Sequence, residues 1–397
     1  MDLAAAYLPS RDGLCCEPLL PRIAEQARQA DATRSVDAGV IAGIKASDLI
    51  RLSASRSLGG VEATVRAIGD ELEAIAGVCG STAWCLWNHL CVFHYYCTTV
   101  GPDARDLLAG IVRDREWVTY PNGAGSGVTG VRDANSWVLD GKITFASGAR
   151  YGEWTLVMFS HPDEDGAPAL SHTPVRLDTP GVRIDPTWDG AAVRASATDD
   201  VYVDRVRTPV ELARRFYPDY ARRACEPEFA VVDHRYREDW AELGALWLAA
   251  QATGLASAAL AEAAGQASSR KAIFGVPMAK RPGVQMNLGE AAALIAAARA
   301  AWTTGCAETD ARIAAACPPS VADQLRQLGY TTAALKLCDE AMHSILRVLG
   351  GNGLRESGTF ERRWRDFQAM WLHIIAHPDR VNELTGRYLL GVEDERA

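Results

Sequence analysis

The feature that most constrains the fold of this chain is a helical spacing of apolar residues that continues from about residue 240 to residue 390. Val321 and Leu325 illustrate it, because residues four apart share one face of a helix. Pro282-Gly283, Pro318-Pro319 and Gly350–Gly353 interrupt the spacing. The pattern therefore predicts a bundle of four helices, at roughly Trp240–Ala267, Val284–Ala316, Val321–Leu349 and Thr359–Leu390.

The residues before this bundle divide into two further parts. An apolar stripe that includes Val61, Val65 and Ile68 predicts a helix in the first third of the chain. From about residue 117 to residue 209, short β-rich runs alternate with Asp, Gly and Pro, and Asp140-Gly141 predicts a hairpin turn between two of them. We therefore expect an α+β protein with an N-terminal helical domain (1–115), a middle β-barrel or sandwich domain (116–212) and the C-terminal four-helix bundle (213–397).

Size and charge exclude several classes of protein. A chain of 397 residues can bury a large core in two or three domains. The net charge of -9 argues against a general nucleic-acid binder, since affinity for phosphate comes from clustered Lys and Arg. The first residues lack a basic segment, and no apolar run suggests a membrane span. We expect a cytoplasmic protein that binds neither nucleic acid nor membrane.

The cysteines do not suggest a metal site. None of the 10 forms a Cys-x-x-Cys pair, and four of them recur every six residues from Cys79 to Cys97. Six residues turn a helix by about 600°, so these four thiols cannot share one face as metal ligands would. His373 and His377 are spaced for chelation, but no Glu-x-x-His sequence on another predicted helix completes a cage. We expect reduced, mostly buried thiols and no metal.

Three short motifs carry a resemblance to a known family. They are Gly80-Ser81-Thr82-Ala83-Trp84, Phe145-Ala146-Ser147-Gly148, and Leu349-Gly350-Gly351-Asn352-Gly353-Leu354 followed by Arg362-Arg363-Trp364-Arg365-Asp366. Together, and in this order, they resemble the acyl-CoA dehydrogenase superfamily, and within it the group D flavin-dependent monooxygenases. The resemblance extends from about residue 25 to residue 390.

The resemblance implies a flavin between the β-domain and the bundle. It places Trp84, Phe145 and Ser147 beside the isoalloxazine ring, where the serine hydroxyl donates to a ring nitrogen or to a C4a-hydroperoxide. Ser147-Gly148 is also an ordinary strand end. Trp188-Asp-Gly and Arg194-Ala-Ser196 resemble the family's Trp-x-x-x-Gly-x-Arg-x-Thr segment, with Ala192 at the glycine position and Ser196 at the threonine position.

The nucleotide part of the flavin is implied to lie elsewhere. In the family, a neighbouring subunit closes the flavin site. The glycine turn of Gly350, Gly351, Asn352 and Gly353 matches the segment that receives the nucleotide, although a helix end also favours glycine. Arg270-Lys271-Ala-Ile-Phe274-Gly275 resembles the Arg-x-x-Phe-Gly stretch that contacts flavin phosphate, with one extra residue, so either Arg270 or Lys271 is the match. The resemblance thus also implies a homotetramer or homodimer.

The C-terminal acid/base position decides the expected chemistry. Acyl-CoA dehydrogenases use a glutamate eight residues beyond the aspartate of an Arg-Asp pair, and here that position holds Ile374. The alternative glutamate position falls near Gly244. Group D monooxygenases commonly carry a histidine one residue earlier, and this chain has His373 there. An imidazole can act as a base or hold a hydrogen bond near neutral pH, although the same histidine could merely pack in the bundle.

A second histidine is expected near the flavin. His89 follows the Gly80–Trp84 motif in a stretch where dibenzothiophene monooxygenase-like members place a histidine, and His94 is the alternative. Both also fit an aromatic core.

The function implied is a two-component monooxygenase. A separate reductase would supply reduced FAD or FMN, O2 would form a C4a-hydroperoxyflavin, and Ser147 and His89 would stabilise it while His373 acts as base on a small-molecule substrate. No Gly-x-Gly-x-x-Gly follows a strand, so we expect no nicotinamide site. The alternatives are an acyl-CoA dehydrogenase-like oxidoreductase with a displaced base and a non-catalytic binding protein.

Overall fold

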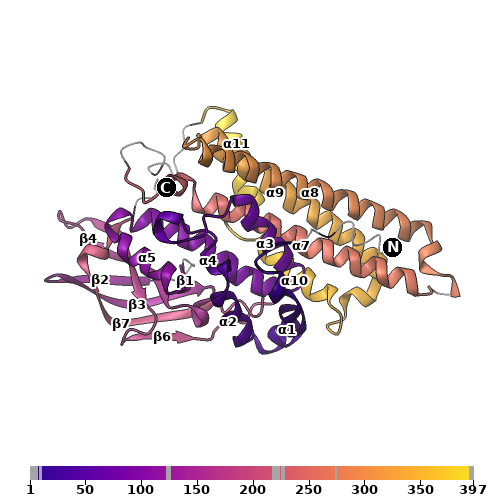
Figure 1. The fold of residues 1–397 in the computed structure, drawn as a ribbon, viewed down its shortest axis with the longest axis horizontal. Helices are drawn as coiled ribbons and strands as arrows, with labels where there is room; N and C mark the ends of the chain where they lie inside the picture. Colours follow the sequence, from indigo (N-terminus) through magenta and orange to yellow (C-terminus); the bar gives the residue numbers. More distant parts are fainter. Residues whose placement is uncertain are drawn as a thin grey trace.

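The computed structural model describes residues 11–121, 127–216, 229–272 and 275–392, together with Leu8 and Ala224. Helices precede and follow a central sheet, which confirms the predicted α+β class, and the sheet lies at one end of the long axis (Figure 1). The N-terminal helices are α1 (Leu20–Thr33), α2 (Ala38–Ala46), α3 (Val65–Ala76), α4 (Gly80–Thr99) and α5 (Arg105–Arg113). The C-terminal helices are α7 (Trp240–Ser269), α8 (Pro282–Ala314), α9 (Val321–Leu349), α10 (Phe360–Trp371) and α11 (Pro378–Leu389).

The strands form one mixed sheet in the order β6-β7-β3-β2-β4-β5-β8, with β1 parallel to β4. Thr173 on β5 and Thr208 on β7 hydrogen-bond at 2.8 Å although three strands lie between them in the sheet order. The sheet is therefore strongly curled, and among the described residues it has two ends rather than a closed barrel. The strands are β1 (Val118–Thr119), β2 (Gly127–Asp133), β3 (Ser136–Ala146), β4 (Trp154–Pro162), β5 (Pro168–Arg176), β6 (Val182–Asp185), β7 (Asp199–Pro209) and β8 (Arg214–Arg215).

The predicted turn at Asp140-Gly141 is wrong, because β3 continues through it. The pairing of β3 with β7 shifts register between Leu139 and Gly141, and the Asp140 carboxylate accepts the backbone N–H of Arg205 at 2.8 Å. Gly141 has φ 147°, and a Cβ there would lie 2.1 Å from the carbonyl oxygen of Gly127. The Asp-Gly pair thus forms a β-bulge, in which glycine permits a close approach of β2.

Two predicted helix boundaries also differ from the structure. The stripe that includes Val61 begins as a helix only at Val65, because the Thr64 side chain caps the backbone N–H of Ala67. The last predicted helix is two helices, α10 and α11, separated by a turn that contains His373. Pro378 disfavours helical backbone at the preceding residue, and His377 is extended with ψ 124°.

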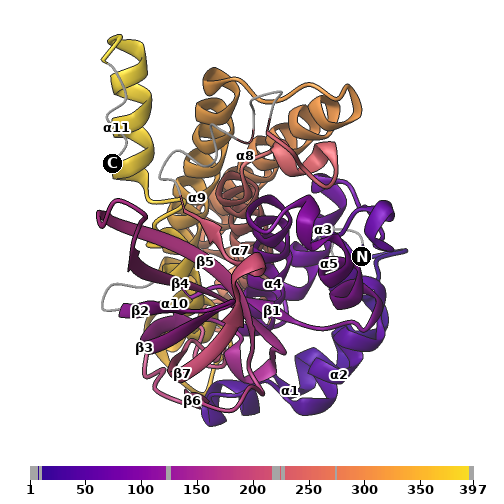
Figure 2. The same ribbon diagram turned by 90° about the vertical axis from the view of Figure 1, so that its left-hand side faces the viewer.

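Helix α4 lies at the junction of all three parts. Every residue of α4 is buried, and it contacts α3, α7, α10 and β1. Its partner α7 is apolar and long enough to span a membrane by length and composition, yet 94% of its most apolar window is buried within the protein. The N-terminal helices lie beside the sheet (Figure 2), and the bundle extends away from it along the long axis (Figure 1). This arrangement surrounds α4 with the sheet on one side and α10 on another.

Candidate active site

An aromatic cleft of about 700 Å³ lies where α4, the sheet and the end of α10 meet. Its size is that of a pocket for a small molecule or a cofactor ring. None of the described residues that line it is Asp, Glu, Lys or Arg. The lining residues are Trp84, Trp87, Asn88, Cys91, Val92, Tyr120, Phe145, Ser147, Trp188, Val193, Thr198, Trp240, Ala369, Leu372, His373, Ile374 and Ile375.

One face of α4 forms the length of this cleft. Its five lining residues fall at positions i, i+3, i+4, i+7 and i+8, which places them on one side of a helix. At about 1.5 Å per residue, they cover about 12 Å along the axis. The Trp84 end adjoins Ser147, and the Val92 end approaches Tyr95, whose ring contacts Tyr120 and Trp240 at 4.9 and 4.7 Å. The cleft therefore has a hydroxyl-lined end and an aromatic end.

Ser147 lies in a chain of hydrogen-bonded hydroxyl groups. Strands β3 and β7 pair Ala146 with Asp199, so Ser147 and Thr198 come together just beyond the paired residues. Their hydroxyl oxygens are 2.8 Å apart, and Thr198 is 2.6 Å from the hydroxyl of Ser196. The Trp84 indole N–H donates to the Ser147 oxygen at 3.1 Å. Because indole only donates, it occupies a lone pair of Ser147 and leaves the serine proton available to a neighbour or a ligand.

The backbone around these hydroxyls is in uncommon conformations. Phe145, Val193 and Ala197 have φ of 61°, 40° and 48°, values that non-glycine residues seldom adopt. Phe145 is 52% exposed, and its ring contacts that of Trp188 edge-on at 6.0 Å. Such outliers persist only where the surrounding structure holds them, and they are frequent at functional sites.

His373 faces the cleft between two tryptophans. Its ring meets Trp84 and Trp87 edge-on, with centroids 5.5 and 5.2 Å away. Nδ1 lies 3.4 Å from the backbone N–H of Ile375, which favours the tautomer with its proton on Nε2. Desolvation lowers the pKa of His373 to about 4. The ring is therefore neutral at pH 7, and Ile374 beside it is 66% exposed and also lines the cleft.

The side chain of Asp366 contacts two other segments of the chain next to the site. Its carboxylate accepts the backbone N–H of Val193 at 2.7 Å, and it packs so closely on Gly80 that a Cβ there would lie 2.7 Å from the carboxylate. It thereby joins α10, the start of α4 and the segment that leads to Ser196. Burial raises the pKa of Asp366 to about 7, against a hydrogen bond from Val193 that lowers it.

We predict that Asp366 makes the protein less stable as pH rises. The folded-state pKa is raised from 3.8, so the protonated form is favoured in the native state, and stability declines as pH rises from about 4 towards 7. In urea titrations, the unfolding free energy of Asp366→Asn minus that of wild type should therefore increase with pH. The increase should be roughly 2 to 3 kcal/mol between about pH 5 and about pH 8. Asp323→Asn is the control, since the pKa of Asp323 is lowered by its bond to Ser320, and its difference from wild type should stay constant over this range. A constant difference for Asp366→Asn would contradict the prediction.

His89 and His94 are not among the described residues that line the cleft. The backbone N–H of Val118 donates to His89 Nδ1 at 3.0 Å, and Nε2 lies 2.8 Å from the carbonyl oxygen of Ile50. Both ring nitrogens therefore hold α4 to its neighbours, and burial lowers the pKa of His89 to about 4. His94 is likewise bonded to the Glu238 carbonyl at 2.8 Å. Both rings are therefore held by hydrogen bonds to backbone groups.

The residues expected at the flavin nucleotide lie away from the cleft of their own chain. Trp240, which lines the cleft, is the first residue of α7, and Arg270 follows the last residue of the same helix. Because a helix of 30 residues is about 45 Å long, Arg270 lies far from the cleft. Lys271 is exposed beside it, and Phe274 lies outside the described residues. Gly350, Gly351, Asn352 and Gly353 form a short 3₁₀ turn after α9, and none of them lines the cleft. Within one chain these residues do not join Trp84, Phe145 and Ser147.

Sequence reasoning missed several residues of the site. Asn88, Tyr120, Thr198 and Trp240 line the cleft but were not expected there. Asn88 could have been found from its spacing of four residues from Trp84. Because α4 is buried on all sides, however, its sequence shows no polar face that would reveal which side borders a cavity.

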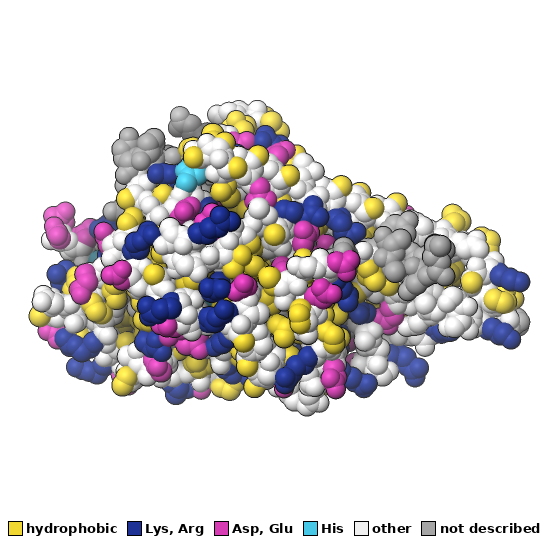
Figure 3. Space-filling model, in the orientation of Figure 1, with side chains coloured by type: hydrophobic (Ala, Val, Ile, Leu, Met, Phe, Trp, Pro, Cys, Tyr) yellow, Lys and Arg dark blue, Asp and Glu magenta, His cyan; other side chains and the backbone are white. Residues whose placement is uncertain are grey.

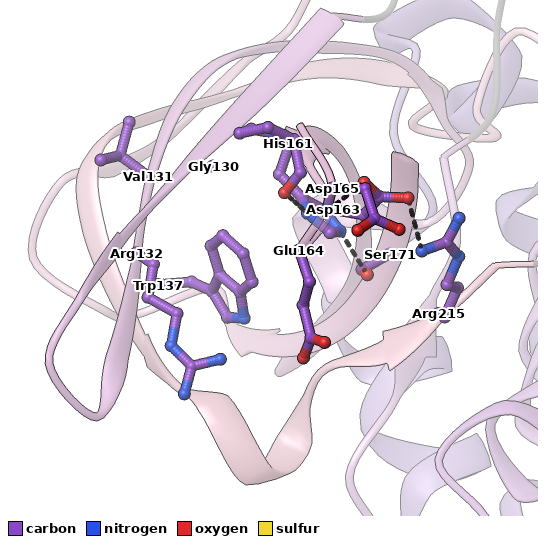
Figure 4. A pocket seen from close by; sticks show the side chains of 11 residues that line it. Gly130, Val131, Arg132, Trp137, His161, Asp163, Glu164, Asp165, Ser171 and Arg215 are labelled. Carbon is purple, nitrogen blue, oxygen red and sulfur yellow. Dashed lines mark hydrogen bonds and ion pairs between the residues drawn. The ribbon is translucent and has the colours of Figure 1, made fainter. Parts of the chain in front are cut away.

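A second cleft, of about 630 Å³, lies on the β-domain (Figure 4). It is lined by β2, β3 and the turn between β4 and β5, and no residue expected in the site lies there. Its polar groups are largely engaged with one another: His161 with Ser171 at 2.8 Å, and Asp163 with Arg215 at 3.4 Å and with two backbone N–H groups. The aromatic cleft is therefore the stronger candidate.

The chain is similar to known proteins over most of its length. Residues 246–378 match the family model described as acyl-CoA dehydrogenase, C-terminal domain. The chain is 24% identical over 387 residues to an FADH(2)-dependent resorcinol hydroxylase, oxygenase component, of Rhizobium sp. (strain MTP-10005), covering 92% of this chain and 91% of that protein. It is 26% identical to cyclohexane-1-carbonyl-CoA dehydrogenase of Geobacter metallireducens, covering 87% of each. The solved structure of XiaF from Streptomyces sp. in complex with FADH2 and glycerol superposes with a TM-score of 0.86 at 20% identity, covering 95% of this chain and 94% of that one.

Proposed function

We propose that the chain is a member of the acyl-CoA dehydrogenase superfamily and, within it, the oxygenase component of a two-component flavin-dependent monooxygenase. The observation that carries this proposal is the absence of a carboxylate among the described residues that line the cleft. Ile374 stands where a dehydrogenase would have its glutamate, and the neutral imidazole of His373 faces the cleft beside it. Removal of a proton next to a thioester carbonyl needs a base that this cleft lacks.

The dehydrogenase alternative lacks a displaced base. Glu242 is the carboxylate nearest in sequence to the alternative position at Gly244. It is 6% exposed and borders a separate small hollow together with Arg380, not the aromatic cleft. The choice of an oxygenase over a dehydrogenase therefore follows from which residues reach the cleft.

The residues of the cleft fit a flavin ring. The cleft combines planar aromatic walls with the hydroxyls of Ser147 and Thr198 at one end, and its volume of about 700 Å³ leaves room for a second ligand beside a tricyclic ring. When bound, reduced flavin would react with O2 and supply one oxygen atom to the substrate. We propose that Trp84, Phe145 and Ser147 contact this ring.

The side chains of the cleft have distinct roles in this proposal. Ser147 donates a hydrogen bond into the cleft while Trp84 and Thr198 hold its oxygen in place. His373 presents Nε2–H between the two tryptophan rings, a position for hydrogen bonding to the bound ligands rather than for carrying a charge. The aromatic walls exclude water, which protects reactive species from hydrolysis and side reactions.

The flavin phosphate requires residues from outside this cleft. No Lys or Arg is among the described lining residues, so Arg270 or Lys271, with the Gly350–Gly353 turn, would serve the cleft of a second copy. The outer face of α8 supports such an assembly, because its alanines at 293, 296, 297, 300 and 307 are exposed. Hydrophobic atoms lie along this edge of the molecule (Figure 3). We propose a homodimer or homotetramer.

The remaining partners are a flavin reductase and a small-molecule substrate. Nine cysteines among the described residues are free, which supports a reducing, cytoplasmic location. Basic and acidic side chains are interspersed on the face seen in Figure 3.

A rapid-mixing experiment tests the proposed function. The protein is loaded anaerobically with reduced FMN or FAD and mixed with O2, and absorbance is followed. A transient species that precedes the oxidised flavin spectrum, and that lasts longer than with free flavin, is expected. Immediate formation of oxidised flavin would refute an oxygenase, bleaching of bound oxidised flavin by acyl thioesters would indicate a dehydrogenase, and failure to bind either flavin would indicate a binding protein.

A further inference from the structure

Arg34 is bonded to a loop that forms one wall of the aromatic cleft. Its guanidinium donates to the backbone carbonyl oxygens of Trp188 at 3.1 Å, Gly190 at 3.0 Å and Asp189 at 3.4 Å. Trp188 lines the cleft, and its ring meets that of Phe145 edge-on. Arg34 itself is not among the described residues that line the cleft. It therefore holds this wall from outside the cleft.

The backbone at the end of α1 does not account for an arginine at this position. Arg34 is the C-cap of α1, and its φ of 55° is a left-handed value that glycine usually supplies at a helix end. Glycine here would fit the backbone but would leave the loop carbonyls without their donor. A guanidinium can bond several oxygen atoms at once, because its N–H groups form a rigid fork. The side chain therefore explains the residue.

A second arginine joins the same loop to the β-domain. The Arg150 guanidinium donates to the Asp199 carboxylate at 2.6 Å and to the backbone carbonyl of Arg34 at 2.8 Å. Asp199 is fully buried, pairs with Ala146 in the sheet, and accepts the backbone N–H of Trp188 at 3.3 Å. The backbone N–H and the backbone carbonyl of Trp188 are thus both held by one hydrogen-bonded network.

The ring of Trp188 is held within the same short loop. Its indole N–H donates to the backbone carbonyl of Val193 at 3.2 Å. Gly190 lies so close to the ring that a Cβ there would be 2.2 Å from it. Because close-packed groups transmit displacements to one another, a shift of the backbone at Trp188 or Gly190 would move the ring.

We propose that Arg34 is a positioning residue for the cleft: it sets the place of the Trp188 ring and, through that ring, the fit of the cleft to the flavin. The proposal rests on the proposed function in that the flavin ring lies beside Phe145, which Trp188 contacts. Arg34 acts through the loop backbone and lines no part of the cleft. A wall displaced by about 1 Å loses much of its contact with a planar ligand.

Fluorine NMR of the flavin-free protein tests whether Arg34 positions the ring. The 11 tryptophans are labelled as 5-fluorotryptophan, and the Trp188 resonance is the one missing from Trp188→Phe. Arg34→Gly should shift or broaden this resonance, and it should fold because glycine adopts the left-handed backbone without strain. Arg28→Ala, at an exposed position on the same helix, should leave the resonance unchanged. An unchanged Trp188 resonance in Arg34→Gly would overturn the proposal.

Anaerobic titration with reduced FAD tests the consequence for the cleft. Arg34→Gly should bind reduced FAD roughly tenfold more weakly than wild type does, and Arg28→Ala should bind it equally well. In a Trp188→Ala background, Arg34→Gly should change the affinity by less than about twofold, since the ring that it positions is gone. The same tenfold loss in both backgrounds would show that Arg34 does not act through Trp188.

Gly190→Ala tests the position of the ring by an independent route. The added Cβ would displace the Trp188 ring while Arg34 stays in the protein, so a shifted resonance and weaker binding of reduced FAD should occur together. A shifted resonance with unchanged affinity would refute the link between ring position and flavin binding.

Failure of the role of Arg34 is distinguishable from failure of the proposed function. A long-lived transient after mixing with O2, combined with an unchanged Trp188 resonance in Arg34→Gly, would refute the role of Arg34 and leave the oxygenase in place. Immediate flavin oxidation, combined with a shifted resonance and a Trp188-dependent loss of affinity, would refute the oxygenase and leave Arg34 as a positioning residue of a flavin site.

Discussion

Replacing Ser147 by alanine is expected to lower product formation roughly a hundredfold while reduced flavin continues to be oxidised. The reason is the loss of a pre-positioned hydrogen-bond donor, an effect of about this size where charge develops in a buried site. Trp84 and Thr198 hold the serine oxygen, so no other hydroxyl can move into its place without breaking their contacts. Product and hydrogen peroxide should be measured together, since oxygen that is not transferred should appear as peroxide.

Two further variants control for this result. Thr198→Val removes the hydroxyl that bonds to Ser147 but keeps the Ser147 hydroxyl as a donor, so a smaller loss of product formation is expected. Ser160→Ala removes an exposed hydroxyl on β4 that contacts the Val128 carbonyl, and it should have no effect. Equal activity of Ser147→Ala and Ser160→Ala would rule out a direct role for Ser147.

Replacing His373 by alanine is expected to lower turnover roughly a hundredfold to a thousandfold. Desolvation lowers the pKa of the ring to about 4, so the neutral form predominates above that pH. Wild-type activity should therefore persist across neutral pH and fall only as pH falls through about 4, where the ring gains a proton. Turnover as a function of pH, with folding followed in parallel, measures this.

The controls for His373 separate chemistry from structure. His373→Gln retains a polar side chain of similar size and should recover part of the activity if hydrogen bonding is the role. His343→Ala alters an exposed histidine on α9 that packs on Trp364, and it should leave the pH profile unchanged. An acidic limb near the ordinary histidine pKa of about 6.5, or the same limb in His373→Ala, would contradict the assignment.

Local patterns were sufficient for the fold class and for part of the site. Helical spacing and β-rich runs predict the order of helices and strands, because periodicity reflects burial on one side of each element. The motifs that contain Trp84, Phe145 and Ser147 predict residues that lie together in the cleft. His373 also reaches the cleft, although it does so from a turn rather than from the continuous helix that was predicted.

The partners of each side chain were decided by tertiary structure. His89 and Asn88 are neighbours in sequence on a helix that is buried all round, yet the His89 ring bonds to two backbone groups, whereas Asn88 is among the residues that line the cleft. Their residue types predict the reverse, since histidine is the commoner catalytic group. Local sequence determines that a helix forms here and that it is buried. Which face of that helix meets backbone and which meets a cavity depends on the docking of β1, the Ser147 segment and α10, elements that lie far away in the chain.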